Sequence, residues 1–144
     1  MAFYNNGFRN SGVARVTSIL LYYLSKEKYF NIYLITNARI VKDEYLIPNN
    51  VKRISLMMQN HSIFQIIENE QIDILIYNFY YRKEIDKLNK LNKTKIIFYN
   101  HSSFIFWIYR NIYNFNNSIY QAYKSCKYVI SLIPLENDYL FKKW

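Results

Sequence analysis

The only two glycines of the chain, Gly7 and Gly12, lie in one short loop. The loop follows the apolar residues 2–4 and runs into a segment with apolar residues at helical spacing. Those residues are Val13, Val16, Ile19, Leu20 and Tyr23. A strand, a glycine loop and a helix N-terminus together form an anion-binding corner, because the backbone N–H groups and the helix dipole attract negative charge. The alternative is a turn that needs one glycine for a positive φ.

A second candidate for chemistry is His101. It directly follows the apolar run 95–100, which is typical of a strand buried on both faces. Ser102 and Ser103 come next and can cap a following helix. The histidine therefore either contacts a ligand at the end of that strand or is satisfied locally in its loop. His61 opens a helix instead, and we interpret it as structural.

The motifs of several common enzyme classes are missing. The two glycines do not supply the dinucleotide fingerprint Gly-x-Gly-x-x-Gly, and no phosphate-binding Gly-Lys-Ser/Thr or Gly-x-Ser-x-Gly elbow occurs. No Asp-x-Asp motif and no His/Cys cluster of metal-ligand spacing is present. We therefore expect no metal and no other cofactor.

The composition indicates an ordered chain of one domain. The 144 residues are 51% hydrophobic and 19% aromatic, which excludes disorder. The single cysteine, Cys126, cannot form an internal disulfide and fits a reducing cytosol. No apolar run is long enough for a transmembrane helix, and no signal peptide is recognisable at the N-terminus. We therefore expect a cytoplasmic protein.

The net charge of +9 has two interpretations. The basic residues are spread along the chain, and the wealth of Lys, Asn, Ile and Tyr fits the coding bias of an AT-rich genome. The alternative is a preference for an anionic membrane surface or for phosphorylated ligands. We expect no nucleic-acid partner, because no basic stripe or recognised binding motif is present.

Strand-like and helix-like segments alternate along the chain. This order predicts an α/β fold: a Rossmann-like, doubly wound, mostly parallel sheet with helices on both faces, in one domain over residues 1–144. Ligands of such sheets bind at the carboxyl ends of the strands. That rule selects the Gly12 loop, the residues after Asn78, and His101. The expected strands are 1–4, 30–36, 51–56, 72–78, 95–100 and 128–133, and the expected helices are 12–26, 62–70, 82–92, 104–115, 117–125 and 136–143.

Several of these segments resemble a known family. Residues 6–16 (NGFRNSGVARV), an apolar helix and then residues 30–36 (FNIYLIT) are similar to the N-terminal domain of group 1 glycosyltransferases, which are retaining enzymes of the GT-B fold. Their first loop commonly reads Gly-Gly-x-Glu-Arg. The strand that ends in His101 resembles the family's strand with a terminal histidine. Residues 129–131 and 137–139 resemble a later segment, so the likeness covers essentially the whole chain.

The resemblance implies roles for particular residues. In the family the glycine loop lies against the donor diphosphate and the acceptor, which assigns that role to Ser11 and Gly12, and Arg15 matches the motif's arginine. The strand-end histidine contacts the transferred sugar, so His101 is the implied catalytic residue. Two departures stand out: Ser11 replaces the usual first glycine, and Ala14 replaces the usual glutamate.

The resemblance also implies an activity. It is the transfer of a sugar from a nucleotide-sugar to a glycan or lipid-linked acceptor in cell-envelope polysaccharide synthesis. Most of the family's nucleotide-sugar site lies in a second Rossmann-like domain, which these 144 residues do not include. We therefore expect a fragment or split subunit that lacks full activity without a separate C-terminal domain. The alternative is a non-catalytic Rossmann-like module that binds a sugar or phosphate or pairs with another subunit.

The segment 104–115 is unusually rich in aromatic residues. Phe106 and Trp107 lie close in sequence to Arg110, and aromatic residues near a cation suit a bilayer interface or a lipid-linked acceptor. This pattern predicts peripheral contact with the inner face of the membrane. The alternative is a helix packed between this domain and a partner domain.

Overall fold

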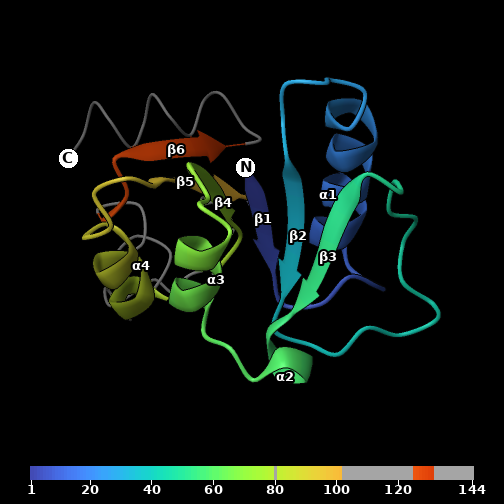
Figure 1. Ribbon diagram of the computed structural model, residues 1–144, viewed down its shortest axis with the longest axis horizontal. Coiled ribbons are helices and arrows are strands. Elements are labelled where there is room, and N and C mark those ends of the chain that lie inside the picture. The colour runs from blue at the N-terminus through green and yellow to red at the C-terminus, as the bar shows by residue number, and fades with distance from the viewer. Residues whose placement is uncertain (80, 102–124, 132–144) are drawn as a thin grey trace, which may run out of the picture.

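The computed structural model describes residues 1–79, 81–101 and 125–131. Its described strands form one six-stranded parallel sheet in the order β3-β2-β1-β4-β5-β6 (Figure 1). The strand order reverses at β1, which lies between β2 and β4. The predicted Rossmann-like α/β fold is therefore confirmed. The strands are β1 (Ala2–Asn5), β2 (Ile32–Thr36), β3 (Val51–Ser55), β4 (Ile74–Tyr77), β5 (Lys95–Asn100) and β6 (Tyr128–Ser131).

Helices cover both faces of the sheet. The helix α1 (Gly12–Leu24) packs on one face, whereas α3 (Ile63–Asn69) and α4 (Arg82–Leu88) pack on the other. Because successive strand residues point to opposite faces, Tyr4 belongs to the core under α3 and α4, and its neighbour Phe3 belongs to the core under α1. A one-turn helix, α2 (Leu56–Gln59), follows β3 directly and is not among the predicted elements.

The buried face of α1 agrees only in part with the predicted one, since Val16 and Leu20 pack against the core but are not the most buried residues of the helix. Ala14, Thr17 and Leu21 face the sheet and are at most 1% exposed, whereas Ile19 is 51% and Tyr23 is 62% exposed. Thr17 on this face accepts a hydrogen bond from Asn5 at the end of β1, which holds this side of the helix against the sheet. The apolar pattern alone does not indicate which stripe will contact the sheet.

Other predicted boundaries agree with the structure to within a few residues, and β5 has the predicted bounds. The predicted helices 104–115 and 136–143 lie outside the described residues, as does the helix 117–125 apart from Ser125. Among the described residues, no helix has the length and hydrophobicity that a membrane span requires.

Candidate functional site

Three side chains from three neighbouring strands meet where the strand order reverses. Asn5 ends β1, Asn78 follows β4 and His101 follows β5. The Nδ2 group of Asn78 donates to Asn5 Oδ1 at 2.6 Å, and His101 Nε2 lies 2.7 Å from Asn78 Oδ1. Asn5 Nδ2 in turn donates to Thr17 Oγ1 of α1 at 3.1 Å. We call these four hydrogen-bonded residues, Thr17, Asn5, Asn78 and His101, the His101 chain.

The hydrogen bonds of Asn78 define the state of the imidazole. The amide of Asn78 uses its nitrogen to donate to Asn5, so its oxygen is the group that faces His101. An amide oxygen only accepts hydrogen bonds, so Nε2 of His101 carries the hydrogen and Nδ1 is the unprotonated nitrogen. The ring also packs against Tyr99, with 4.1 Å between ring centroids.

Burial keeps this histidine neutral. Desolvation lowers the pKa of His101 from 6.5 to about 4, so the imidazole is uncharged at neutral pH. Its Nδ1 atom is buried and has no hydrogen-bond partner within the described part of the chain. The histidine therefore keeps a neutral, buried acceptor nitrogen near the carboxyl edge of the sheet.

The residues expected at the phosphate approach lie at the start of α1. Ser11 is the N-cap, and its Oγ accepts from the backbone N–H of Ala14 at 3.1 Å. Gly12 is the first helical residue, and a Cβ atom placed there would meet no atom within 4 Å. Arg15 is exposed to solvent. Between described residues, no hydrogen bond or ion pair joins Ser11, Gly12 or Arg15 directly to His101.

The glycine loop does not need a glycine for its backbone conformation. Neither Gly7 nor Gly12 has a positive φ, and the left-handed residue of the loop is Asn10, with φ 49°. The interpretation of a turn that requires one glycine for a positive φ is therefore wrong. What Gly12 provides is open space at a helix N-terminus, which suits the close approach of an anion.

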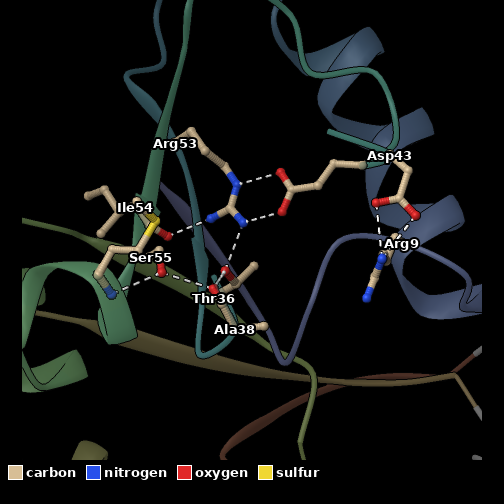
Figure 2. A network of polar contacts seen from close by, with 9 residues as sticks. Arg9, Thr36, Ala38, Asp43, Arg53, Ile54 and Ser55 are labelled. Carbon is tan, nitrogen blue, oxygen red and sulfur yellow. Dashed lines mark hydrogen bonds and ion pairs between the residues drawn. The ribbon is translucent and has the colours of Figure 1, made fainter. Parts of the chain in front are cut away.

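The long connection 37–50 is held by a buried ion pair (Figure 2). Arg53 Nη2 donates to Glu44 Oε1 at 2.7 Å and Arg53 Nε donates to Glu44 Oε2 at 3.0 Å. The guanidinium also donates to Thr36 Oγ1 at 2.8 Å and to the carbonyl oxygen of Ile54 at 2.6 Å. Only 12% of the arginine and 7% of the glutamate side chain is exposed.

The same connection also holds the loop before α1. Both carboxylate oxygens of Asp43 accept from Arg9 at 3.0 Å, as Figure 2 shows. The backbone N–H of Tyr45 donates to the carbonyl oxygen of Phe8 at 3.0 Å, and their rings meet edge to face. Asp43 and Glu44 therefore link the candidate phosphate loop to the strand β3.

A pocket of about 660 Å³ opens on the opposite face of the sheet from α1. We call it the α3 pocket, because residues around the start of α3 form much of its wall. Tyr4 OH donates to Asn37 Oδ1 at 2.7 Å, and Tyr77 OH donates to Glu84 Oε2 at 2.5 Å. The lining residues that bear on its chemistry are Tyr4, Asn37, His61, Phe64, Gln65 and Glu84.

The buried Tyr4 lines this pocket, and the buried Tyr77 holds the lining residue Glu84. Burial and the nearby negative charge of Glu84 raise the pKa of Tyr4 and of Tyr77, so both phenols stay protonated and act as donors. His61, which the sequence led us to interpret as structural, is exposed and lines the pocket. It is therefore available to a ligand there.

The positions of Asn5, Asn78 and Glu84 were not among our predictions from the sequence. The two asparagines carry a usable signal, because each is a polar residue that ends or follows an apolar strand. Glu84 carries no such signal, since it is one of several charged residues in the segment 82–92. Only the fold shows that Glu84 accepts a hydrogen bond from Tyr77 of β4 and lines a pocket together with Tyr4 of β1.

The remaining expectations concern metals and a membrane-facing segment. Within residues 1–79, 81–101 and 125–131, no group of three or more His, Cys, Asp or Glu side chains could hold a metal ion.

The predicted face for a membrane or a lipid-linked acceptor lies outside the described residues. It consists of Phe106, Trp107 and Arg110.

Comparison with known proteins does not identify a family. No protein-family model, no curated protein and no solved structure matches this chain. The fold, the geometry of the His101 chain and the sequence resemblance described above are the features that bear on function.

Proposed function

We propose that this chain is the acceptor-side, Rossmann-like domain of a GT-B glycosyltransferase. Such an enzyme transfers a sugar from a nucleotide-sugar to a glycan or lipid-linked acceptor in cell-envelope polysaccharide synthesis. The observation that carries the proposal is the position of His101. It follows β5 at the carboxyl edge of the sheet, with Nε2 bonded to Asn78 and Nδ1 unpartnered within the described residues. A strand-end histidine of this kind contacts the transferred sugar in the family that the sequence resembles.

The fold supports this assignment. In open parallel sheets, ligands bind at the carboxyl ends of the strands and at the point where the strand order reverses. That point lies between β1 and β4, where Asn5 at the end of β1 and Asn78 after β4 belong to the His101 chain, and His101 follows the next strand, β5. The start of α1, with Gly12 exposed and Arg15 on the first turn, provides a helix N-terminus for the donor diphosphate.

The state of the imidazole suits contact with a sugar. A neutral imidazole with an unprotonated Nδ1 accepts a hydrogen bond from a sugar hydroxyl. Because the imidazole is uncharged, it does not repel the positive charge that develops on the sugar ring in the transition state. Because Asn78 already holds the ring in place, little reorganisation is needed as the glycosidic bond breaks. A hydrogen bond that strengthens in the transition state is worth a few kcal/mol, or roughly a hundredfold in rate.

The proposal includes a cytoplasmic location at the inner face of the membrane. The net charge of +9 favours attraction to anionic lipid headgroups, which would bring the enzyme to lipid-linked acceptors. Liposome flotation tests this part: binding should rise with the content of anionic lipid and fall in Phe106→Ala/Trp107→Ala. Equal flotation of the double variant would remove those residues from the membrane contact.

The activity is tested by reconstitution. The chain is expressed with the polypeptide that is encoded directly downstream, and transfer from UDP- and GDP-sugars to extracted lipids and glycans is measured. We expect sugar incorporation by the native chain and about a hundredfold less by His101→Ala, because one transition-state contact is lost. Turnover should fall far more than the thermal midpoint, which loses only the contacts of His101 with Asn78 and Tyr99.

The outcomes separate the proposal from its alternative. Sugar binding without transfer to any acceptor would favour a non-catalytic binding module. Sub-micromolar binding of a nucleotide-sugar by this chain alone would show that the donor site is complete here, which contradicts an acceptor-side role. Unfolding of His101→Ala would make the histidine a structural residue.

A further inference from the structure

The α3 pocket differs in charge from the rest of the protein. The chain as a whole carries a net charge of +9. None of the described residues that line the pocket is a lysine or an arginine, and the one carboxylate among them is Glu84. A site for phosphate or another anion would need cations or free backbone N–H groups. The lining therefore offers an anion no lysine or arginine and places the carboxylate of Glu84 beside it, although the backbone N–H groups at the start of α3 also border the pocket.

Glu84 is held in a fixed position without a cation. Tyr77 is fully buried, and its hydroxyl donates to Glu84 Oε2 at 2.5 Å. No lysine or arginine of the described residues pairs with Glu84, although Arg82 on the same helix pairs with Asp86. Within the described part of the chain no hydrogen bond reaches Glu84 Oε1, and a carboxylate oxygen accepts hydrogen bonds from hydroxyl donors.

The other polar groups of the pocket are neutral. Asn37 Oδ1 is occupied by the hydroxyl of Tyr4, which leaves the Nδ2 group of that amide to donate. Phe64 adds a partly buried aromatic surface to the wall. A few convergent polar groups on an apolar wall are typical of a small-molecule site that fixes the orientation of its ligand.

We propose that the α3 pocket binds a neutral, hydroxyl-rich ring, which is the terminal sugar of the acceptor. Ring hydroxyls donate to Glu84 and accept from Asn37, and the carbon face of the ring packs against Phe64. Calling this ring the acceptor depends on the proposed function, whereas the binding itself does not.

The position of the pocket fits this role. Tyr4 lines the pocket, and the next residue, Asn5, belongs to the His101 chain. Since adjacent strand residues point to opposite faces, β1 presents one side chain to each site at the same end of the sheet. An acceptor hydroxyl that extends past the end of β1 would therefore approach a sugar held at His101.

The test is an amide NMR titration of the whole chain with neutral methyl glycosides and with a hexose phosphate. The glycosides should shift the amides of Asn37, Phe64 and Gln65, and the phosphate should bind more weakly. Glu84→Gln should weaken glycoside binding by about tenfold, because hydrogen bonds to an ionised group are stronger than neutral ones. The matched control is Glu68→Gln, an exposed glutamate on α3 outside the pocket, which should bind as the native chain does.

A second variant does not depend on Glu84. Met57 lines the pocket and is 63% exposed, so Met57→Lys adds a cation with little risk to folding. It should strengthen binding of the hexose phosphate and reduce the preference for neutral glycosides. The proposal is overturned if the phosphate binds the native chain as tightly as the glycosides do, or if Glu84→Gln and Glu68→Gln bind glycosides equally.

These results are independent of the proposed function, because no nucleotide-sugar and no transfer step is involved. Binding is read from the amides of Asn37, Phe64 and Gln65, which line the pocket, whereas His101 does not. Glycoside binding in a chain that supports no transfer would keep the pocket and reject the enzyme. Transfer activity without glycoside binding at the pocket would support the enzyme and reject the pocket.

Discussion

His101 donates the Nε2 hydrogen of its ring to Asn78 Oδ1 at 2.7 Å. This bond selects one tautomer, fixes the plane of the ring and directs the free lone pair to Nδ1. Asn78 is held in turn by Asn5, so the orientation of the histidine is set by two neighbouring strands. Asn78 is therefore a positioning residue for His101.

Asn78→Asp should raise the pKa of His101 well above its present value of about 4. A carboxylate beside Nε2 favours the imidazolium, whereas the neutral amide does not. An NMR titration of the ring measures the change, in a His61→Gln background that leaves one histidine in the chain. Asn78→Ser, which adds no charge, is the matched control. The same pKa in the Asp and Ser variants would show that residue 78 does not contact the ring.

His101 should make folding stability depend on pH. Its pKa is about 4 in the folded chain and 6.5 when exposed, so the unfolded state binds one more proton between these values. The contribution of neutral His101 to the free energy of unfolding is fully present above about pH 6.5 and is lost as the pH falls toward about 4. Urea unfolding across this range should show a smaller loss for His101→Gln. Parallel curves for the two proteins would contradict the burial of the ring.

Gly12→Ala should stabilise the protein and impair its function. The residue is helical, lacks a positive φ and has open space at the Cβ position, so alanine should add about 0.4–1 kcal/mol by restricting the unfolded chain. The added methyl group would also occupy the proposed approach of the donor diphosphate. Calorimetric melting and the reconstituted transfer assay measure the two effects. Full activity in the alanine variant would exclude close contact between Gly12 and the donor.

Loss of Glu44 should destabilise the fold far more than loss of Asp43. Glu44→Ala leaves the buried guanidinium of Arg53 without its counter-charge, which typically costs about 3–5 kcal/mol. The Arg9–Asp43 pair is 51% and 58% exposed, and removing such a pair costs no more than about 1 kcal/mol. Chemical denaturation of Glu44→Ala and Asp43→Ala gives both values. Equal losses would mean that the Arg53 pair is hydrated in solution.

Cys126 should react slowly with thiol reagents while the chain is folded. Burial, together with the nearby charge of Asp86, raises the pKa of its thiol to about 12, and the thiolate is the reactive form. A disulfide exchange reagent should therefore label the native protein slowly and the urea-unfolded protein rapidly. Rapid labelling of the native protein would place the thiol in contact with solvent.

The sheet could be predicted from the sequence, because its strands are short, nearly continuous apolar runs. Residues 72–78 and 95–100 are typical of strands buried on both faces, and the structure forms β4 and β5 there. The helix α2 was missed since it is a single turn of four residues that directly follows a strand. Periodicity requires a longer segment to be recognised.

The sites could be predicted only in part. His101 was found because its signal is local: a polar residue with useful chemistry at the end of an apolar run. The α3 pocket has no such signal, since Tyr4, Asn37 and Glu84 are far apart in sequence. They come together through the parallel pairing of strands, so the pocket could not be seen before the topology was known.

The central position of β1 has a consequence for the order in which the protein folds. The strand β1 is made before its partners β2 and β4, with Ala2 paired to Tyr33 on one side and to Leu75 on the other. Pairing between distant segments slows folding, because loop closure must come before the contacts form. During synthesis on the ribosome, one edge of this apolar strand stays unpaired until β4 has emerged. The nascent chain is therefore most exposed to aggregation before residue 77 is available, and a chaperone that covers its first strand would act in that interval.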